Sequence, residues 1–355
     1  MSSLRVIQWG TGNVGRHALR GIIRRPDLEL VGVHAHSPAK IGRDAAELCG
    51  LSEPTGVVAT DDIDALLALD ADCVSYTVQG ESRIDDTLDE LCMILAAGKN
   101  VVNTALVFLV NPAFLDDATR GRLTEACEKG GTTLLTSGID PGWSGDVVPL
   151  LVAQMCERVD SIRVSELMNY GEYADPAFTG EVFGFGLPLD HPAALFEPGA
   201  VTFGWGGIVR LLADALGWTL DEIREEHERL PAPETFHTAM GRIEQGSTAA
   251  VRFDVTGVVG GRPAIVAAHV NRLRDDIGPD WPILAGGRSG YRVEVTGHPS
   301  FTLELEPRLD GGGDHAEAGL IGSAMRILNA IPTVCAAPPG LVTPLDLPFF
   351  TVNGA

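Results

Sequence analysis

Positive charge is scarce in this sequence. Its 355 residues include 26 lysines and arginines against 48 aspartates and glutamates, which gives a formal net charge of −22. Proteins bind nucleic acids and anionic membrane surfaces through clustered basic residues, and the sequence shows no such cluster. We therefore expect neither nucleic acid nor a membrane as a partner. The acidic residues are spread along the chain, which is typical of a solvated surface.

Long apolar runs and paired cysteines are also missing. No apolar run approaches the ~18 residues that a membrane-spanning helix needs, and the first predicted strand starts too near Met1 for a signal peptide. The six cysteines form no Cys-x-x-Cys pair and lie mostly in apolar stretches, where free buried thiols are expected. These absences predict a soluble, cytoplasmic protein.

Motifs of hydrolases, metalloproteases and nucleoside triphosphatases are absent as well. The sequence contains no His-Glu-x-x-His, Gly-x-Ser-x-Gly or Walker pattern. His34 and His36 lie on one face of a predicted strand, but no further metal-binding side chain is near them in the sequence. We expect no metal site.

The clearest positive signal lies at the start of the chain. Residues 4–9 are typical of a short strand, residues 10–15 read Gly-Thr-Gly-Asn-Val-Gly, and residues 16–24 have helical spacing. A strand, a glycine-rich turn and a helix in this order predict a dinucleotide-binding site, with the pyrophosphate at the helix N-terminus. The alternative is a glycine turn without a cofactor. The predicted phosphate-binding residues are Gly10, Thr11, Gly12, Asn13, Val14 and Gly15.

The end of the second predicted strand indicates which cofactor is bound. NAD-binding units usually carry an acid about 20 residues past the glycines, to bind the ribose 2′-hydroxyl. This chain has His36, Ser37 and Lys40 there instead. Such groups suit a 2′-phosphate, so we predict NADP(H), with NAD(H) as the alternative. Thr77 and Thr104, after the fourth and fifth strands, complete the predicted cofactor contacts.

The order of the predicted elements gives the fold class. Strands and helices alternate every 20 to 30 residues up to residue 137, which predicts an α/β protein with a Rossmann-type, doubly wound parallel sheet. After residue 160 the pattern changes to an irregular aromatic stretch (169–205), two helices (208–216 and 219–228) and period-2 strands. Those strands are expected at 246–259, 262–273, 290–296 and 300–306.

The chain therefore divides into three predicted segments. Residues 1–145 form the dinucleotide-binding domain, and residues 146–312 form an α+β substrate domain. Residues 313–355 contain a helix and an apolar tail that returns to the first domain. The helix is expected to begin at a capping box, residues 314–317, and to end near Asn329 because Pro332 follows.

Candidate catalytic and substrate-binding residues follow the sixth strand. Asp140 lies in a Gly- and Pro-containing turn at the carboxyl end of that strand, and Tyr170 opens the aromatic stretch; these two are the predicted catalytic residues. Glu166 and Glu172 are further candidates. The predicted substrate-lining residues are Trp143, Tyr170, Tyr173 and His191. The alternative for each of them is a purely structural place in the core or at the surface. His269 and Asn271 share one strand face, toward either a pocket or a dimer partner.

Several segments together resemble a known family. Residues 6–15, 37–45, 98–104, 138–143 and 329–340 are similar to the dihydrodipicolinate reductase-like superfamily, in the branch of 2,4-diaminopentanoate dehydrogenase and the native amine dehydrogenases. The resemblance implies a Rossmann domain joined to an α+β substrate and dimerisation domain, a homodimer, and NAD(P)-linked hydride transfer to or from a small carbonyl, imine or amine substrate.

The chain also departs from its relatives at two places. It lacks the His-His-x-x-Lys signature of true dihydrodipicolinate reductases. Residues 105–110 are wholly apolar, whereas the amine dehydrogenases place a glutamate there. The second departure leaves three possibilities open: an acid supplied from elsewhere, such as Asp140; a ketone or imine reductase that uses no ammonia; or a non-catalytic NADP-binding sensor or scaffold.

Overall fold

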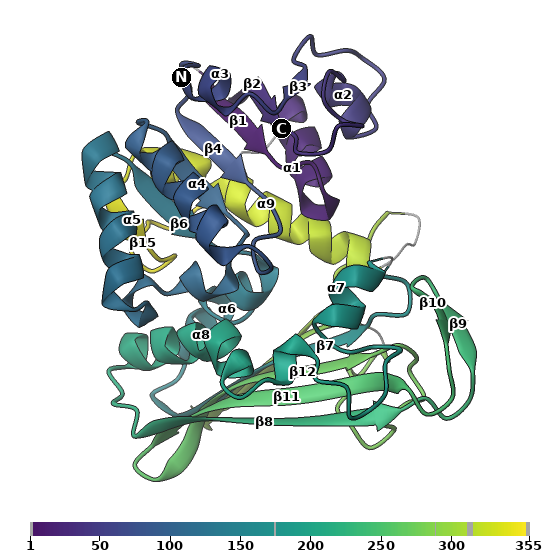
Figure 1. Cartoon of the computed structure of the whole chain (residues 1–355). Coiled ribbons are helices and arrows are strands. Elements are labelled where there is room, and N and C mark those ends of the chain that lie inside the picture. Colours follow the sequence, from purple (N-terminus) through teal and green to yellow (C-terminus); the bar gives the residue numbers. More distant parts are fainter. Residues whose placement is uncertain (1–2, 174, 288, 311–314, 353–355) are drawn as a thin grey trace. The chain divides into compact units, whose positions relative to one another are not determined.

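The computed structural model describes residues 3–173, 175–287, 289–310 and 315–352 (Figure 1). The chain forms two compact units, each built on its own large sheet. Unit 1 comprises Met1–Ile139 together with Leu320–Ala355, and unit 2 comprises Asp140–Gly319. The C-terminal tail thus belongs to the same unit as the N-terminal strands.

Unit 1 contains a parallel sheet of seven strands in the order β15-β6-β5-β4-β1-β2-β3. The predicted doubly wound parallel sheet is confirmed. Its strands are β1 (Leu4–Trp9), β2 (Leu28–His34), β3 (Ala59–Thr60), β4 (Cys73–Tyr76), β5 (Asn100–Asn103), β6 (Thr133–Thr136) and β15 (Gly340–Val342). Its helices are α1 (Asn13–Arg24), α2 (Ala45–Leu48), α3 (Ile63–Leu67), α4 (Ile84–Ala96), α5 (Asp117–Gly130) and most of α9 (His315–Cys335).

Helices cover both faces of this sheet because the strand residues are apolar on both sides. Successive residues of a strand point to opposite faces. Val6 packs with Ile22 of α1 and Ile327 of α9 in one core cluster. The next residue, Ile7, packs with Leu91 of α4 in another. Continuous apolar strands of this kind are typical of parallel sheets that are buried on both faces.

Helix α9 extends further than its sequence predicts. Pro332 was expected to end it, but the helix continues to Cys335 with Pro332 inside it. Ile331 and Val334, on either side of the proline, are buried in the core of unit 1, and this packing outweighs the hydrogen bond that proline cannot donate. The expected N-cap, Asp314, lies outside the described residues.

Helix α9 is also apolar. In the described part of the chain it is the helix whose length and composition would suffice to cross a membrane. Its residues Ala324, Leu328 and Ile331 contribute to the core of unit 1, as expected for an internal helix of a globular fold.

Unit 2 contains a mixed sheet of six strands in the order β14-β13-β7-β12-β11-β8. The four predicted period-2 strands are confirmed as β11 (Thr248–Val259), β12 (Arg262–Arg272), β13 (Gly290–His298) and β14 (Phe301–Leu305). They are joined by β7 (Arg158–Asn169), β8 (Glu222–Pro231) and a small hairpin, β9 (Phe236–Thr238) and β10 (Gly241–Ile243). The helices are α6 (Val147–Ala153), α7 (Pro176–Glu181) and α8 (Ala200–Leu216).

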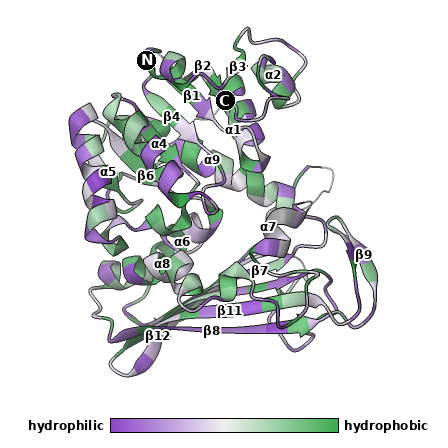
Figure 2. Cartoon of the chain, in the orientation of Figure 1, coloured by the Kyte–Doolittle hydropathy of each residue, from purple (hydrophilic) through white to green (hydrophobic). Residues whose placement is uncertain are grey.

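Two expectations for unit 2 were wrong. The helix predicted at 219–228 is the edge strand β8, and part of the stretch predicted as irregular is helical, in α7 and the start of α8. Strand β8 is rich in charged residues, as its largely hydrophilic colour in Figure 2 shows. Pairing with β11 along its whole length overrides its local helix preference, and charge on an edge strand also prevents pairing with other chains.

Glycine is required at position 15 by its close contacts. A Cβ atom at Gly15 would lie 2.3 Å from the carbonyl oxygen of Gly10 and 2.7 Å from the hydroxyl of Thr77. We expect Gly15→Ala to destabilise the protein by about 1 to 3 kcal/mol and to displace the turn, measured by thermal unfolding without any cofactor. Gly12→Ala is the matched control, because a Cβ atom there meets nothing within 4 Å. Equal melting temperatures for the two variants would contradict the prediction.

Candidate active site

The glycine-rich turn, residues 10–15, connects β1 to α1 at the carboxyl end of the unit 1 sheet. Gly10 has a φ of +92°, and its N–H donates to the carbonyl of His34 at 3.1 Å. The side-chain amide of Gln8 donates to the Gly10 carbonyl at 2.8 Å. The surroundings of Gly12 are open, and the first turn of α1 carries no acidic residue. These features fit a bound pyrophosphate. Thr11, Asn13 and Val14 belong to the same turn.

Thr77 lies beneath this turn. Its hydroxyl accepts a hydrogen bond from Gln8 at 2.8 Å and lies 3.2 Å from the Gly10 carbonyl, and the residue is only 8% exposed. Its position indicates support of the turn. Thr104 follows β5 and its N–H donates to the Tyr76 carbonyl at 3.1 Å. That these two threonines contact a cofactor stays a prediction.

The loop after β2 brings a cation to the turn. The ammonium group of Lys40 donates to the carbonyl of Thr11 at 2.7 Å. Burial, with a smaller effect of the Arg43 charge, lowers the pKa of Lys40. His36 and Ser37, which precede it, are exposed. Of the three predicted 2′-phosphate residues, Lys40 is the one that the structure places directly against the glycine-rich turn.

Three rings lie side by side at the ends of the central strands of unit 1. Tyr76, Trp9 and His34 are the last residues of β4, β1 and β2, and they are paired in register. The ring of Trp9 stacks on His34 at 4.3 Å and on Tyr76 at 6.3 Å. Trp9 and Tyr76 both donate to the carboxylate of Glu90, at 3.2 and 2.7 Å. The row therefore forms part of the packed interior at the carboxyl ends of these three strands.

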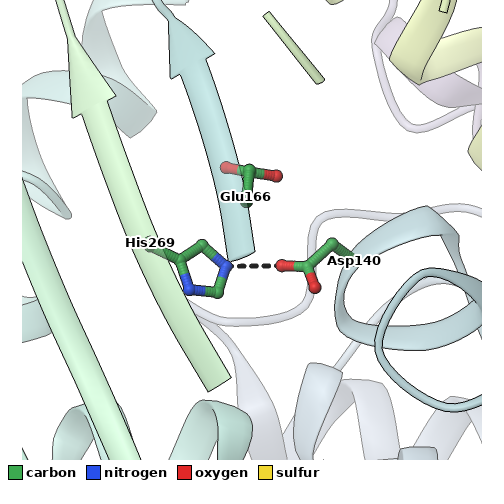
Figure 3. A group of neighbouring side chains, drawn as sticks. All are labelled: Asp140, Glu166 and His269. Carbon is green, nitrogen blue, oxygen red and sulfur yellow. Dashed lines mark hydrogen bonds and ion pairs between the residues drawn. The ribbon is translucent and has the colours of Figure 1, made fainter. Parts of the chain in front are cut away.

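Unit 2 carries a cluster of two carboxylates and one imidazole, formed by Asp140, Glu166 and His269 (Figure 3). The Nε2 atom of His269 lies 2.5 Å from Oδ2 of Asp140, and one side-chain atom from each of the three residues lies within 4.8 Å of the others. The side chains of His269 and Asp140 are 3% and 8% exposed. Charged groups this close and this buried interact strongly and exchange protons readily.

The register of the sheet brings the cluster together. His269 of β12 is paired with Glu166 of β7 on one side and with Phe253 of β11 on the other. Tyr291 of β13 is paired with Glu166. All four side chains lie on one face of the sheet, called here the inner face. Helix α8 packs on this face, where Val209 lies close to Gly257 of β11. Asp140 comes from the turn Ile139–Trp143.

Aromatic rings hold the imidazole and the aspartate in place. The His269 ring stacks on Phe253 with a centroid distance of 4.3 Å and an interplanar angle of 12°. Trp205 of α8 meets the same ring edge-on at 4.6 Å, and its indole N–H donates to Asp140 Oδ2 at 3.1 Å. Oδ2 of Asp140 thus has two partners, which fixes the carboxylate relative to the imidazole.

The buried setting shifts the protonation of the cluster. Burial, with a smaller contribution from the nearby charge of Asp140, raises the pKa of Glu166 to about 7, against the opposing effects of His269, Asn271 and Tyr170. Burial alone would lower the pKa of His269, but the charge and hydrogen bond of Asp140, with the charge of Glu166, raise it above its ordinary value. The cluster therefore contains one acid, Glu166, that titrates near neutral pH, as acid–base catalysis requires, beside an imidazole whose pKa is raised.

Tyr170, predicted as catalytic, contacts this cluster. Its hydroxyl donates to Oε1 of Glu166 at 3.4 Å, and burial raises the pKa of Tyr170 well above its usual range. Asn271 donates to the same oxygen at 2.8 Å. Tyr173, Phe183 and Phe185 surround the Tyr170 ring at centroid distances of 5.5 to 6.2 Å. The aromatic stretch therefore packs around Tyr170 and orients its hydroxyl.

The other predicted residues lie in different surroundings. Trp143 is half-buried in the turn that contains Asp140. His191 is half-buried, and its carbonyl accepts a hydrogen bond from Arg229 at 2.7 Å. Glu172 lines a separate hollow of about 540 Å³, together with Arg274 and Asp276. Substrate contact by Trp143, Tyr173 and His191 stays a prediction.

Sequence reasoning chose Asp140 and Tyr170 but not the histidine that the structure places beside Asp140. The available signal was the alternation of β12, which puts His269 and Asn271 on one face. The structure shows that this is the buried inner face. Trp205 gave no such signal, since its stretch was expected to be irregular.

The cluster resembles a metal site in composition, and its shortest contact is the hydrogen bond between His269 and Asp140. Two ligands of one tetrahedral zinc ion, each about 2.0 to 2.2 Å from it, are separated by about 3 Å or more. The contact of 2.5 Å between His269 and Asp140 is shorter. In the described residues these three side chains are the group with metal-binding spacing, and the absence of a metal stays a prediction.

Comparisons with known proteins agree with the resemblance noted in the sequence. The family model of the 2,4-diaminopentanoate dehydrogenase C-terminal domain matches residues 146–353. An amine dehydrogenase of Streptomyces virginiae is 38% identical over 347 residues, which cover 97% of this chain and 96% of that protein. A 2,4-diaminopentanoate dehydrogenase of Acetoanaerobium sticklandii is 25% identical over 364 residues, with 98% and 94% covered.

A solved structure confirms the fold. The amine dehydrogenase of Mycobacterium smegmatis superimposes with a TM-score of 0.80 at 21% identity, over 99% of this chain and 98% of that one. The relatives are dehydrogenases, so the prediction of an oxidoreductase with a nicotinamide cofactor is confirmed. The chain belongs to the 2,4-diaminopentanoate dehydrogenase family, the branch of dihydrodipicolinate reductase-like oxidoreductases that includes amine dehydrogenases.

Proposed function

We propose that this protein is an NADP(H)-dependent amine dehydrogenase, which interconverts a small amine and the corresponding carbonyl compound. The observation that carries the proposal is the buried cluster of Asp140, Glu166 and His269. Asp140 is the fourth residue after Thr136, the last residue of β6. Four residues span at most about 14 Å, so the chain itself keeps Asp140 close to the carboxyl end of a dinucleotide-binding sheet, where such sheets bind ligands.

The reaction fits the groups in the cluster. In the oxidative direction, a protonated amine, NADP⁺ and water give the carbonyl compound, an ammonium ion, NADPH and one proton. When bound, the nicotinamide supplies the acceptor or donor of the hydride. The chain supplies the proton transfers: Asp140 holds the His269 imidazole through Nε2, and Glu166, with a pKa of about 7, exchanges a proton near neutral pH.

The same cluster suits a cationic substrate. Asp140 and Glu166 are two acids near one imidazole, so ionisation of both leaves more negative than positive charge in a buried place. A substrate ammonium group placed against Glu166 would relieve this imbalance, as an opposite charge does for a buried carboxylate. The buried tyrosines and phenylalanines around Tyr170 offer an apolar neighbourhood for the carbon skeleton.

Lys40 supports NADP(H) as the preferred cofactor. Its ammonium lies 2.7 Å from the Thr11 carbonyl, in the turn expected to hold the pyrophosphate. A cation there, with the exposed His36 and Ser37 before it, favours a ribose 2′-phosphate.

The proposal includes a homodimer in the cytoplasm. Helix α8 covers the inner face of the unit 2 sheet, whereas Arg163 and Asp254 form a half-exposed ion pair on the other face, which is available to a second copy. The cysteines are all free in the described residues, as is usual in a reducing compartment. Light scattering of the purified protein would measure the oligomeric state.

Turnover assays test the function. Purified protein would be given small primary amines with NADP⁺, and ketones or aldehydes with NADPH, with and without ammonium. We expect amine oxidation and ammonium-dependent carbonyl reduction. Cofactor binding without turnover of any member of the panel would favour the sensor or scaffold. Carbonyl reduction at the same rate with and without ammonium would favour a ketone reductase.

Asp140→Asn tests the cluster directly. The substitution keeps the shape of the side chain but removes the charge that holds the His269 imidazolium. We expect kcat to fall by about 10²- to 10⁴-fold with the fold intact. The control is Glu172→Gln, in the separate hollow, which is expected to leave kcat within about twofold of wild type. A kcat of Asp140→Asn close to that of the control would exclude Asp140 from the chemistry.

Glu166→Gln tests the shifted acid through stability. The folded-state pKa of Glu166, about 7, lies above its ordinary value of 4.5, so the folded protein holds more protons between these pH values and loses stability as pH rises through them. A neutral glutamine avoids this loss. The stability of Glu166→Gln relative to wild type should rise between pH 5 and pH 8, by up to roughly 3 kcal/mol, in denaturant titrations. A difference that does not change with pH would contradict the raised pKa.

Lys40→Gln tests the cofactor preference. If Lys40 binds the 2′-phosphate, removing its charge should raise KM for NADPH by roughly tenfold or more, with KM for NADH changed by less than about twofold. Lys40→Arg should retain the preference. An equal rise for both cofactors would instead assign Lys40 to holding the turn through Thr11.

A further inference from the structure

Asn271 lies beside the cluster on the inner face of the unit 2 sheet. It is two residues beyond His269 in β12, and alternate residues of a strand point to the same face. The residue is fully buried, and its side-chain amide donates to Oε1 of Glu166 at 2.8 Å. Because an ionised carboxylate only accepts hydrogen bonds, this bond fixes the NH₂ end of the amide toward Glu166.

The other end of the same amide is an unpaired acceptor. Oδ1 of Asn271 is buried and has no hydrogen-bonding partner among the residues that the structure describes. A buried acceptor without a donor costs free energy, and nearly all such atoms in folded proteins are bonded to protein, water or a bound ion. Oδ1 of Asn271 therefore marks a place for a small donor from outside the chain.

Covalent geometry keeps this oxygen close to the Glu166 carboxylate. Nδ2 of Asn271 is 2.8 Å from Oε1 of Glu166, and the oxygen and nitrogen of one amide are about 2.2 Å apart. Oδ1 therefore lies no more than about 5 Å from Oε1. A nitrogen about 2.8 Å from each of two oxygens spans up to about 5.6 Å, so one nitrogen donor is able to bond both atoms.

The charges of the cluster favour a cation as this donor. The imidazole of His269 is bonded to Asp140 (Figure 3), whereas the hydrogen bonds to Oε1 of Glu166 come from two neutral groups, Asn271 and Tyr170. The Tyr170 bond is long at 3.4 Å, which leaves Oε1 able to accept a further donor. A cation placed there would stabilise the ionised form of this buried acid.

Burial restricts the size of the ligand. Asn271 is fully buried and Glu166 is 9% exposed, so the cation must be compact. It must also carry at least two N–H donors, one for each oxygen. An ammonium ion meets both conditions, since it is about as large as a water molecule. All the groups that would hold it belong to unit 2.

We propose that Asn271 and Glu166 form a binding site for a free ammonium ion, with Oδ1 of Asn271 and the Glu166 carboxylate as its acceptors. The place of this site in the reaction rests on the proposed function, because carbonyl amination consumes ammonium and amine oxidation releases it. Binding of the ion itself does not depend on that function. Asn271 selects for ammonium over other small monovalent cations, because potassium, of similar size and equal charge, has no N–H to donate.

Binding to the protein without cofactor tests the site. Melting temperatures would be compared in ammonium chloride and in potassium chloride of equal ionic strength, at about pH 8.5, where Glu166 is mostly ionised. We expect a higher melting temperature in ammonium, because a ligand that binds the folded state stabilises it. Isothermal titration of wild type with each salt gives the dissociation constants.

Variants of Asn271 locate the binding. Asn271→Leu removes Oδ1 and should weaken ammonium binding by about tenfold or more. Asn271→Asp keeps an oxygen acceptor at this position and should retain the affinity within about threefold. Thr248→Val is the matched control, because Thr248 is also fully buried with an unpaired side-chain oxygen but lies on β11 outside the cluster. It should bind ammonium as wild type does.

Three results would overturn the proposal. They are equal effects of ammonium and potassium on wild type, equal ammonium affinity in Asn271→Leu and wild type, and an equal loss of affinity in Thr248→Val. Melting temperatures in potassium chloride identify a variant that does not fold, and Asn271→Ala replaces Asn271→Leu in that case.

Kinetics distinguish this inference from the proposed function. In carbonyl amination, Asn271→Leu should raise KM for ammonium by about tenfold or more, with KM for NADPH and for the carbonyl compound changed by less than about twofold. An equal rise of all three would assign Asn271 to holding Glu166 and overturn the ammonium site. Selective ammonium binding in a protein without turnover would support the site and overturn the proposed function.

Discussion

The buried hydrogen bond between His269 and Asp140 is the interaction on which unit 2 is organised. Burying an imidazole and a carboxylate away from water costs free energy unless each group has a partner. Here the two groups pair with one another. The sheet register places Glu166 beside the imidazole, α8 contributes Trp205 to the aspartate, and Phe253 stacks on the ring. Three strands, one helix and one turn thus contribute to a single polar cluster.

The nucleotide-binding part of the fold could be predicted from the sequence because its signals are local. The strand, turn and helix of residues 4–24 are contiguous, and the structure shows why two of the glycines are needed: Gly10 has a positive φ, and Gly15 lies in close contact with Gly10. The role of Thr77 was harder to predict from the sequence. Whether a threonine after a strand faces the crevice or supports a neighbouring loop depends on Gln8, 69 residues earlier in the chain.

The candidate site in unit 2 could be predicted only in part. Asp140 and Tyr170 were found because a turn and an aromatic stretch mark them in the sequence. His269 lies 129 residues from Asp140, and its pairing with Glu166 depends on a parallel register between β12 and β7 that no local pattern specifies. The prediction of a helix at residues 219–228 was wrong for the same reason, because pairing of β8 with β11 decides the conformation of this segment.

The row of rings at the ends of β4, β1 and β2 has an optical consequence. Trp9 is fully buried, stacked on His34 and bonded to Glu90, so its emission should be that of an indole shielded from water. It is the residue immediately before the glycine-rich turn, where unit 1 would hold a reduced nicotinamide coenzyme, whose absorption overlaps indole emission. Energy transfer from Trp9 would then report coenzyme occupancy without any added label.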